Sequence, residues 1–252
     1  MQILLTNDDS HDSPLFLLAL KELQQHGDVT VVVPAQEQSW KGKSMTRYGQ
    51  LYVDRIDLHG YPAWSVTGTP ADCVNLGIHN LMPVRPDLVV SGINIGINTG
   101  LGFVMASGTV GAALEANIAG LPGLALSQEL KFDEYIAWSN DRCFDDACIE
   151  EVSAIFRQML PLMWEQLVTG QSDSTTWNVN LPRELRAPEI VRTRMGHSFY
   201  GRVFSQKGDQ YFHQLERFPT DQAPDTDQMV VSHGRVSATR LDIRDLGQII
   251  PD

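Results

Sequence analysis

The N-terminal segment constrains the possible fold more than any other stretch. Residues Ile3 to Leu5 form a short apolar run that stops at Asn7 to Ser10. A short apolar run that ends in turn residues and precedes a helical pattern is typical of a strand buried on both faces of a parallel sheet. Two adjacent carboxylates, Asp8 and Asp9, therefore follow the first predicted strand. Open α/β sheets bind ligands at the carboxyl ends of their strands, so we expect the functional site there.

A β-α-β unit is predicted next. Ser13-Pro14 is typical of a helix start, with Ser as the N-cap and Pro at the first helical position. Val29 to Val33 then form a second apolar run that predicts a buried strand. A right-handed crossover makes the two strands parallel, so their carboxyl ends share one edge. The loop over residues 36–46, which carries Ser39, should leave the sheet beside the two carboxylates.

The rest of the chain continues the alternation of strands and helices. The predicted elements are a hairpin at 49–66, a helix opened by a capping box at Thr69-Pro70-Ala71-Asp72, a buried strand at 86–90, a Gly- and Asn-rich loop at 91–100, an Ala-rich helix from Ser107, a strand at 124–127, a helix at 149–167, a strand at 177–182 and strand-like pieces at 190–193, 229–231 and 236–241. This pattern predicts an α/β fold, a Rossmann-like three-layer α/β/α sandwich with a mostly parallel sheet. We expect a single domain over 1–252, with its core at about 1–130 and 149–182 and a β-rich C-terminal extension at about 185–252.

Composition narrows the classes of partner. The formal net charge is -12, which argues against non-specific binding to a nucleic-acid polymer or to an anionic membrane surface. No stretch approaches the roughly 18 apolar residues of a membrane span. The strand signal begins at residue 2, without a leader pattern, and Cys73, Cys143 and Cys148 match no zinc spacing. Free thiols in a reducing compartment are the simplest interpretation, so we expect a cytoplasmic protein.

The paired carboxylates and nearby polar residues are candidate metal ligands. Two carboxylates at one strand end cannot both ionise cheaply without a cation, and oxygen ligands favour Mg²⁺, Mn²⁺ or Ca²⁺ over zinc. Asn94 should reach the same edge because its strand is predicted beside the first, and Ser39 could add a hydroxyl. The alternative is structural: one Asp caps the following helix, and Asn94 and Asn98 are turn residues.

A second group of residues points to phosphate. Ser107-Gly108-Thr109 precedes the Ala-rich helix, where hydroxyls and free N–H groups meet the positive end of the helix dipole. The same residues could serve only as an N-cap, and the two roles are compatible. Of the histidines, His11 alone falls in the predicted site, as a proton carrier or as part of its entrance.

Competing phosphate-binding folds do not fit the motifs. No G-x-G-x-x-G follows the first strand, and no P-loop pattern occurs. A receiver domain needs an Asp at the end of the third strand, where this chain has Ser91-Gly92, and Asp87 precedes that strand. Haloacid-dehalogenase phosphatases need D-x-D in place of adjacent carboxylates.

Five motifs together resemble the survival protein SurE family of metal-dependent 5'/3'-nucleotidases. The similarity is dense over residues 1–130 and thinner beyond. The matching segments are Asn7-Asp8-Asp9, Ser39, Gly68-Thr69-Pro70 with Asp72-Cys73-Val74, Ser91-Gly92-Ile93-Asn94 with Gly96 and Asn98, Ser107-Gly108-Thr109-Val110, and, more weakly, Asn178 to Pro182, Thr226-Asp227 and Gly234 to Ser237.

The resemblance implies an activity and a set of roles. Family members remove phosphate from nucleoside monophosphates, and some trim short polyphosphate. One divalent cation per subunit is implied, Mn²⁺ or Mg²⁺ with Co²⁺ or Ca²⁺ as alternatives, together with a homodimer or homotetramer built partly by the C-terminal extension. The implied metal ligands are Asp8, Asp9, Ser39 and Asn94, the phosphate-binding residues are Asn98, Ser107, Gly108 and Thr109, and the catalytic candidates are Asp8, Asp9 and His11.

Departures from the family pattern leave one alternative open. Ser10 and Leu15 stand where the family usually has Gly, and Gln38-Ser39-Trp40 replaces Arg-Ser-Gly. Leu101-Gly102 replaces an acidic pair, and Ala106 stands where a Tyr is common. All four implied metal ligands are present, so a phosphomonoesterase is the leading hypothesis. The altered loops at 10–15 and 99–106 favour the alternative, a non-catalytic nucleotide- or metal-binding relative that acts through protein partners.

Overall fold

The computed structural model describes residues 1–170, 175–198, 200–214 and 219–245. The strands are β1 (Gln2–Thr6), β2 (Asp28–Pro34), β3 (Val53–Leu58), β4 (Tyr61–Val66), β5 (Leu88–Ile95), β6 (Gly123–Gln128), β7 (Thr175–Leu181), β8 (Ile190–Thr193), β9 (Phe204–Lys207), β10 (Gln210–His213) and β11 (Val236–Asp242). The helices are α1 (Pro14–Leu23), α2 (Pro70–Leu76), α3 (Leu101–Ala106), α4 (Gly108–Ile118), α5 (Phe132–Asp141), α6 (Asp146–Met163) and α7 (Asp227–Ser232), with short turns η1 (Gly77–Leu81), η2 (Trp164–Val168) and η3 (Ile243–Asp245).

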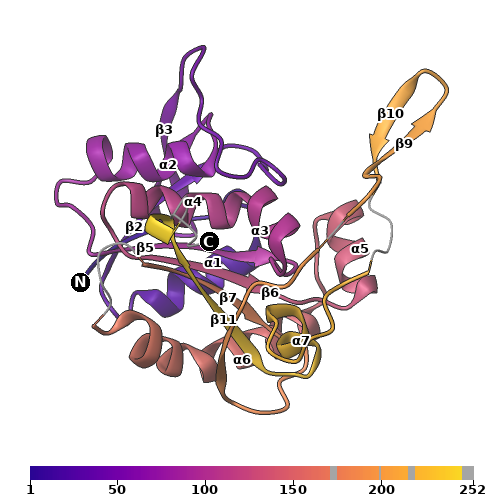
Figure 1. The fold of residues 1–252 in the computed structure, drawn as a ribbon. Helices are drawn as coiled ribbons and strands as arrows, with labels where there is room; N and C mark the ends of the chain where they lie inside the picture. The colour runs from indigo at the N-terminus through magenta and orange to yellow at the C-terminus, as the bar shows by residue number, and fades with distance from the viewer. Residues whose placement is uncertain (171–174, 199, 215–218, 246–252) are drawn as a thin grey trace, which may run out of the picture.

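Within these residues, nine strands form one central sheet (Figure 1). The strand order is β3-β4-β2-β1-β5-β6-β7-β11-β8. The six strands from β4 to β7 in this order run parallel, while β3 and β11 are antiparallel to their neighbours β4 and β7. The expected mostly parallel sheet is confirmed. β11 and β8, from the segment expected to be an elaboration, extend this same sheet.

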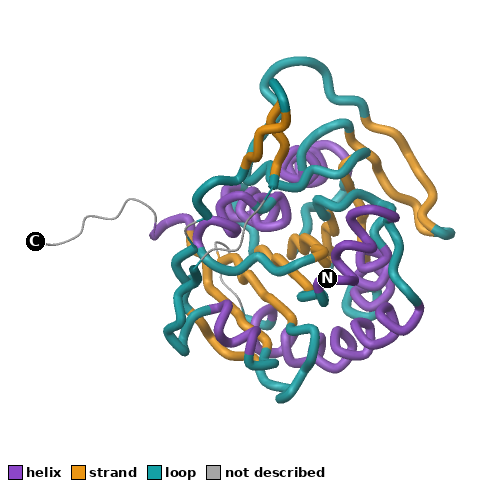
Figure 2. The backbone as a smooth tube through the Cα atoms, turned by 90° about the vertical axis from the view of Figure 1, so that its right-hand side faces the viewer, coloured by secondary structure: helices purple, strands orange, loops and turns teal. Residues whose placement is uncertain are grey.

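Helices cover both faces of the sheet, because the apolar side chains of β1 point alternately to one face and to the other. Ile3 and Leu5 point to one face, where α1 and α6 pack, and Leu4 points to the other, where α2 and α4 pack. Figures 1 and 2 show the strands between the two helical layers. The predicted three-layer α/β/α sandwich is therefore confirmed. A membrane-spanning helix is not found among the described residues.

The parallel register brings three functional segments to one edge. β1 lies between β2 and β5, with Ile3 paired to Val29 on one side and to Leu88 on the other. The segments that follow the carboxyl ends of these strands therefore emerge together. These are the segment with the two carboxylates after β1, the 36–46 loop after β2, and the Asn-rich segment at the end of β5.

The sequence prediction was wrong for two segments. Residues 91–95 were expected in a loop, but β5 continues to Ile95, because Ser91 pairs with Thr6 and Asn94 pairs with Ser127 across a register shift. Neighbouring strands supply hydrogen-bond partners that outweigh the weak strand propensity of Gly and Asn. Residues 229–231 were expected as a strand but lie in α7, which starts where Thr226 accepts from the Met229 N–H.

Helix starts were predicted well, with one difference in detail. α1 begins at Pro14 as expected, but Ser13 makes no side-chain capping bond. The capping box at α2 is confirmed, since Thr69 accepts from the Asp72 N–H and Asp72 accepts from the Thr69 N–H. Two helices, α3 and α5, were not predicted. α3 is a helix of six residues, and α5 is only weakly apolar and largely exposed.

Asp72 also holds the loop that carries Ser39. Its carboxylate accepts from the Thr46 N–H at 3.0 Å and from the Thr46 hydroxyl at 2.7 Å. In return, the Thr69 hydroxyl donates to the Ser44 carbonyl at 2.7 Å. One helix start thus fixes the far end of the 36–46 loop.

We predict that Asp72→Ala lowers the free energy of unfolding by about 2 kcal/mol, because it removes a capping box and the bonds to Thr46. Urea denaturation would measure this change. Asp54→Ala removes an exposed carboxylate on β3 and serves as the control, with an expected change within about 0.5 kcal/mol. Equal stability of the two variants would contradict the role given to Asp72.

Candidate active site

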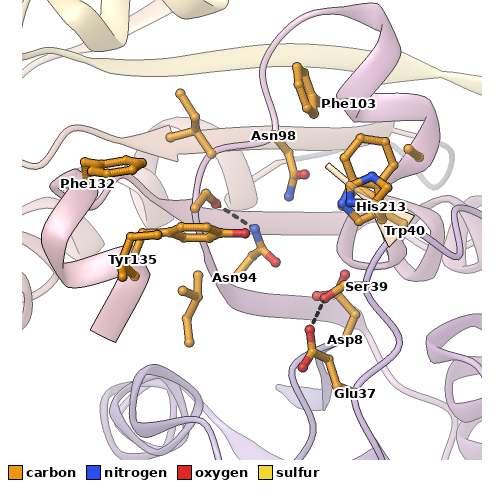
Figure 3. Close-up of a pocket in the computed structure, with 16 residues that line it drawn as sticks. Asp8, Glu37, Ser39, Trp40, Asn94, Asn98, Phe103, Phe132, Tyr135 and His213 are labelled. Carbon is orange, nitrogen blue, oxygen red and sulfur yellow. Dashed lines mark hydrogen bonds between the residues drawn. The ribbon is translucent and has the colours of Figure 1, made fainter. Parts of the chain in front are cut away.

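A cavity of about 540 Å³ opens at the carboxyl edge of the sheet (Figure 3). Its polar wall comes from the loops after β1 and β2, from the end of β5 and the loop that follows it, and from the start of α4. It includes five of the sequence-predicted site residues, and Glu37 is the sixth polar residue. The polar lining residues are Asp8, Glu37, Ser39, Asn94, Asn98 and Ser107. The residues expected from three separate segments are therefore brought together.

Asp8 and Asp9 are both buried, with 3% and 6% of their surface exposed. Asp8 accepts from the Thr109 hydroxyl, and Asp9 accepts from the Ile95 N–H at 3.0 Å. No basic side chain in the described part of the chain pairs with either carboxylate. Burial raises the pKa of Asp8, and burial together with the charge of Asp8 raises the pKa of Asp9 well above its ordinary value.

Asn94 directs an oxygen toward Asp8. Its amide nitrogen donates to the Gly96 carbonyl at 2.6 Å, which fixes the orientation of the amide (Figure 3). Its Oδ1 lies 3.3 Å from the Thr109 hydroxyl oxygen, the same hydroxyl that donates to Asp8 Oδ1. The amide oxygen of Asn94 and the carboxylate of Asp8 therefore both lie next to the Thr109 hydroxyl.

Ser39 reaches the site with Glu37, a residue that the sequence interpretation missed. The Gln38 N–H donates to the Asp8 carbonyl at 2.8 Å, which places the loop beside the carboxylates. The Ser39 hydroxyl donates to Glu37 Oε1 at 2.6 Å, so the oxygen lone pairs of Ser39 remain available as acceptors. Glu37 in turn pairs with Arg142 at the end of α5.

These donors fit a hard divalent cation. Two buried carboxylates that form no salt bridge among the described residues, an oriented amide oxygen and a hydroxyl form an oxygen-only set, which Mg²⁺ and Mn²⁺ prefer. Among the described residues, no group of three His, Cys, Asp or Glu side chains could hold a metal. A cation here would therefore depend on the neutral oxygens of Ser39 and Asn94 as well as on Asp8 and Asp9.

The start of α4 packs directly against Asp8. The Ser107 hydroxyl lines the cavity and accepts from the Val110 N–H at 3.1 Å. A Cβ at Gly108 would lie 2.9 Å from Asp8 Cβ, so a larger residue would displace the carboxylate. Thr109 does not line the cavity, and both its N–H and its hydroxyl serve Asp8. Thr109 therefore fixes the Asp8 carboxylate, whereas the sequence analysis predicted that Thr109 contacts phosphate directly.

Asn98 is held by β6 and β7 with its amide facing the cavity (Figure 3). Its N–H donates to Asn180 Oδ1 at 2.7 Å, and its amide nitrogen donates to the Ser127 hydroxyl at 2.9 Å. Its carbonyl accepts from the Asn178 amide at 2.8 Å. The buried asparagines of β7 thus fix the position of Asn98.

His11 does not line the cavity, although it was a predicted proton carrier. Its Nε2 lies 3.1 Å from Asp12 Oδ1 on the surface side. The sequence interpretation also missed the aromatic part of the wall. These residues are Trp40, Phe103, Phe132, Tyr135 and His213. The spacing of Phe132, Tyr135 and Ile136 is that of one helix face and could have indicated α5.

The fold and the cavity define a three-layer α/β protein with an acidic, oxygen-lined site at the carboxyl edge of its sheet. Comparison with known proteins gives the family. The family described as Survival protein SurE matches residues 3–202. The chain belongs to this family.

Similar proteins match over most of their length. The 5'-nucleotidase SurE of Pelotomaculum thermopropionicum is 36% identical over 95% of this chain and 88% of its own, and that of Methanopyrus kandleri is 33% identical over 96% and 91%. The crystal structure of the SurE protein from Aquifex aeolicus aligns with a TM-score of 0.73 and 29% identity, covering 98% of this chain and 95% of that one.

We predict that Asp9→Asn stabilises the metal-free protein at neutral pH, because it removes a buried charge beside Asp8 but keeps an acceptor for Ile95. A carboxyl whose pKa is raised by folding contributes stability that is present below its unfolded pKa of about 3.9 and is lost as pH rises through the folded pKa. The stability difference between variant and wild type should therefore grow with pH above about 4.

Urea denaturation in chelator from pH 4 to pH 8 would measure this difference. Asp12→Asn is the matched control, since the Asp12 side chain is 76% exposed. Parallel stability curves for Asp9→Asn and wild type across this range would show that Asp9 carries no buried charge.

Proposed function

We propose that this chain is a divalent-metal-dependent phosphomonoesterase that converts nucleoside 5'- and 3'-monophosphates into nucleoside and phosphate. The observation that carries the proposal is the buried pair Asp8 and Asp9, of which Asp8 lines an accessible cavity together with Ser39 and Asn94. Family membership supports it, because relatives from several organisms are named 5'-nucleotidase SurE.

Asp8, Asp9, Ser39 and Asn94 would hold the cation, either Mn²⁺ or Mg²⁺, with Co²⁺ or Ca²⁺ as alternatives. When bound, it would polarise the phosphoryl oxygens and lower the pKa of a water molecule. The protein supplies the rigid frame for this chemistry. The Thr109 hydroxyl and the Gly96 carbonyl fix two of the four ligands before any substrate arrives.

Phosphate would be oriented by Ser107, Gly108 and Asn98. The Ser107 hydroxyl accepts the Val110 N–H through a lone pair, so its proton stays available for a phosphate oxygen. The Thr109 and Val110 N–H groups already serve Asp8 and the Ser107 hydroxyl, which leaves the Gly108 N–H for a phosphate oxygen. The helix dipole also favours an anion at this end of α4. The amide of Asn98 faces the same cavity.

The reaction is a single in-line displacement with no covalent enzyme intermediate. The water oxygen bonds to phosphorus, the bond from phosphorus to the nucleoside oxygen breaks, and the leaving oxygen gains a proton. We assign proton transfer to Asp8, which lines the cavity, and not to His11, which does not.

The alternative of a non-catalytic relative receives no support. The altered segment after Asn98 folds as α3, and Ser107 and Asn98 still line the cavity on either side of it. The altered segment over 10–15 contains the start of α1 and contributes no lining residue.

Assembly and location are further parts of the proposal. We propose a homodimer or homotetramer, supported by the hairpin of β9 and β10, which projects from the body and exposes Phe204, Tyr211 and Phe212 (Figure 1). A cytoplasmic location is supported by the three free cysteines, of which Cys143 is exposed.

We predict that phosphate release from adenosine 5'- and 3'-monophosphate requires Mn²⁺ or Mg²⁺ and stops in chelator. Asp8→Asn should lower kcat/KM at least about a hundredfold, because it removes a charged ligand. It should also abolish the rise in Tm that Mn²⁺ causes in the wild type. Asp87→Asn, at the amino edge of the sheet, is the control.

Two results would contradict the proposal. One is full turnover in chelator, and the other is wild-type turnover by Asp8→Asn. Folded wild-type protein that releases no phosphate from any nucleotide with either metal would favour the binding-protein alternative.

We predict that Ser107→Ala raises KM about tenfold, because it removes a hydrogen bond to a charged group, and lowers stability by about 1 kcal/mol through the lost cap. Steady-state kinetics and urea denaturation would separate the two effects. Asp145→Ala removes the N-cap of α6, which accepts from the Cys148 N–H, and should lower stability with KM unchanged. An unchanged KM in Ser107→Ala would exclude its contact with phosphate.

A further inference from the structure

The loop over residues 36–46, which carries Ser39, has contacts with two helices. It contains no helix or strand of its own, so its position depends on the points at which it is anchored. Asp72 and Thr69 at the start of α2 hold its far end. The middle of the loop lies against α4, and Figure 1 shows α2 and α4 next to each other on one face of the sheet.

The backbone of the loop rests directly on α4. Ser107, Gly111 and Glu115 are spaced four residues apart, so they lie along one side of the helix. A Cβ at Gly111 would lie 2.4 Å from the Gly42 carbonyl oxygen, so only glycine allows the two backbones to approach this closely. The Gly42 N–H in turn donates to the Ala106 carbonyl at 2.8 Å.

A buried ion pair lies beside this backbone contact. Lys43 Nζ of the loop pairs with Glu115 Oε2 of α4. The Glu115 side chain is only 4% exposed, and the Lys43 side chain is 29% exposed. The second carboxylate oxygen of Glu115 accepts from the Asn75 amide of α2 at 2.8 Å. One carboxylate therefore joins the loop, α4 and α2.

This ion pair fixes the register of the loop on the helix. Removing two charges from water offsets much of their attraction, so an apolar pair of similar size would stabilise the fold as well. A shift of the loop, however, would leave Glu115 buried and without its cation, which is strongly unfavourable. On the other side of Ser39, the Gln38 N–H donates to the Asp8 carbonyl at 2.8 Å. Ser39 therefore lies between two fixed points that are five residues apart, Gln38 and Lys43.

We propose that the Lys43–Glu115 ion pair positions Ser39 as a ligand of the divalent cation. The inference rests on the proposed metal-dependent function and adds two positioning residues to it. Neither Lys43 nor Glu115 lines the cavity, so the pair acts through the loop and not by contact with the cation or the substrate. Loss of a group that orients a metal ligand typically lowers metal affinity about ten- to a hundredfold.

Calorimetric titration with Mn²⁺ tests the proposal without turnover. Glu115→Gln keeps an acceptor for Asn75 but removes the charge that holds Lys43, so it should weaken Mn²⁺ binding at least about tenfold. Added to Ser39→Ala, the same change should weaken binding by less than about a further twofold, because the ligand that the pair positions is already absent. Lys41→Met is the control, since Lys41 is an exposed lysine of the same loop without a salt bridge in the described part of the chain.

Hydrogen exchange in chelator tests the position of the loop independently of the metal. The Gly42 amide should exchange at least about tenfold faster in Glu115→Gln and in Lys43→Met than in the wild type. The Val89 amide of β5, which donates to the Pro122 carbonyl, reports any general loss of stability. The increase at Gly42 should therefore exceed the increase at Val89.

The outcomes separate this inference from the proposed function. Unchanged Mn²⁺ affinity in Glu115→Gln, a further tenfold loss when this change is added to Ser39→Ala, or equal increases in exchange at Gly42 and Val89 would overturn the inference alone. Wild-type protein that binds no Mn²⁺ would overturn it together with the proposed function.

Discussion

The repulsion between two buried neighbouring carboxylates is the constraint on which the site depends. Asp8 and Asp9 are removed from water at the end of β1 without a basic partner in the described chain. Their burial is unfavourable unless a cation neutralises them. Oxygen atoms from Ser39 and Asn94 lie at the same edge, so the fold brings the proposed neutral ligands to the negative charge.

Holding this arrangement uses contacts from distant parts of the chain. Thr109 gives Asp8 both its hydroxyl and its N–H, and the missing side chain at Gly108 lets α4 approach the carboxylate. The capping box of α2 anchors the loop that carries Ser39. The starts of α2 and α4 therefore also support the site, and a change at such a position would alter stability and activity together.

Aromatic side chains and the polar site share one cavity. Ser107 and Asn98 line the same cavity as Asp8, and rings from α3, α5 and β10 flank it (Figure 3).

The sequence alone determined the strands and most of the helices up to β7, the starts of α2 and α4, and the meeting of Asp8, Ser39 and Asn94 at one edge. These follow from local apolar runs, capping residues and the handedness of β-α-β crossovers. Tertiary structure decided that residues 91–95 extend β5, that Thr109 serves Asp8, and that His11 lies outside the cavity. It also decided which aromatic rings meet, because Trp40, Phe103, Tyr200 and His213 are far apart in the chain and no local pattern specifies contacts between side chains from separate elements.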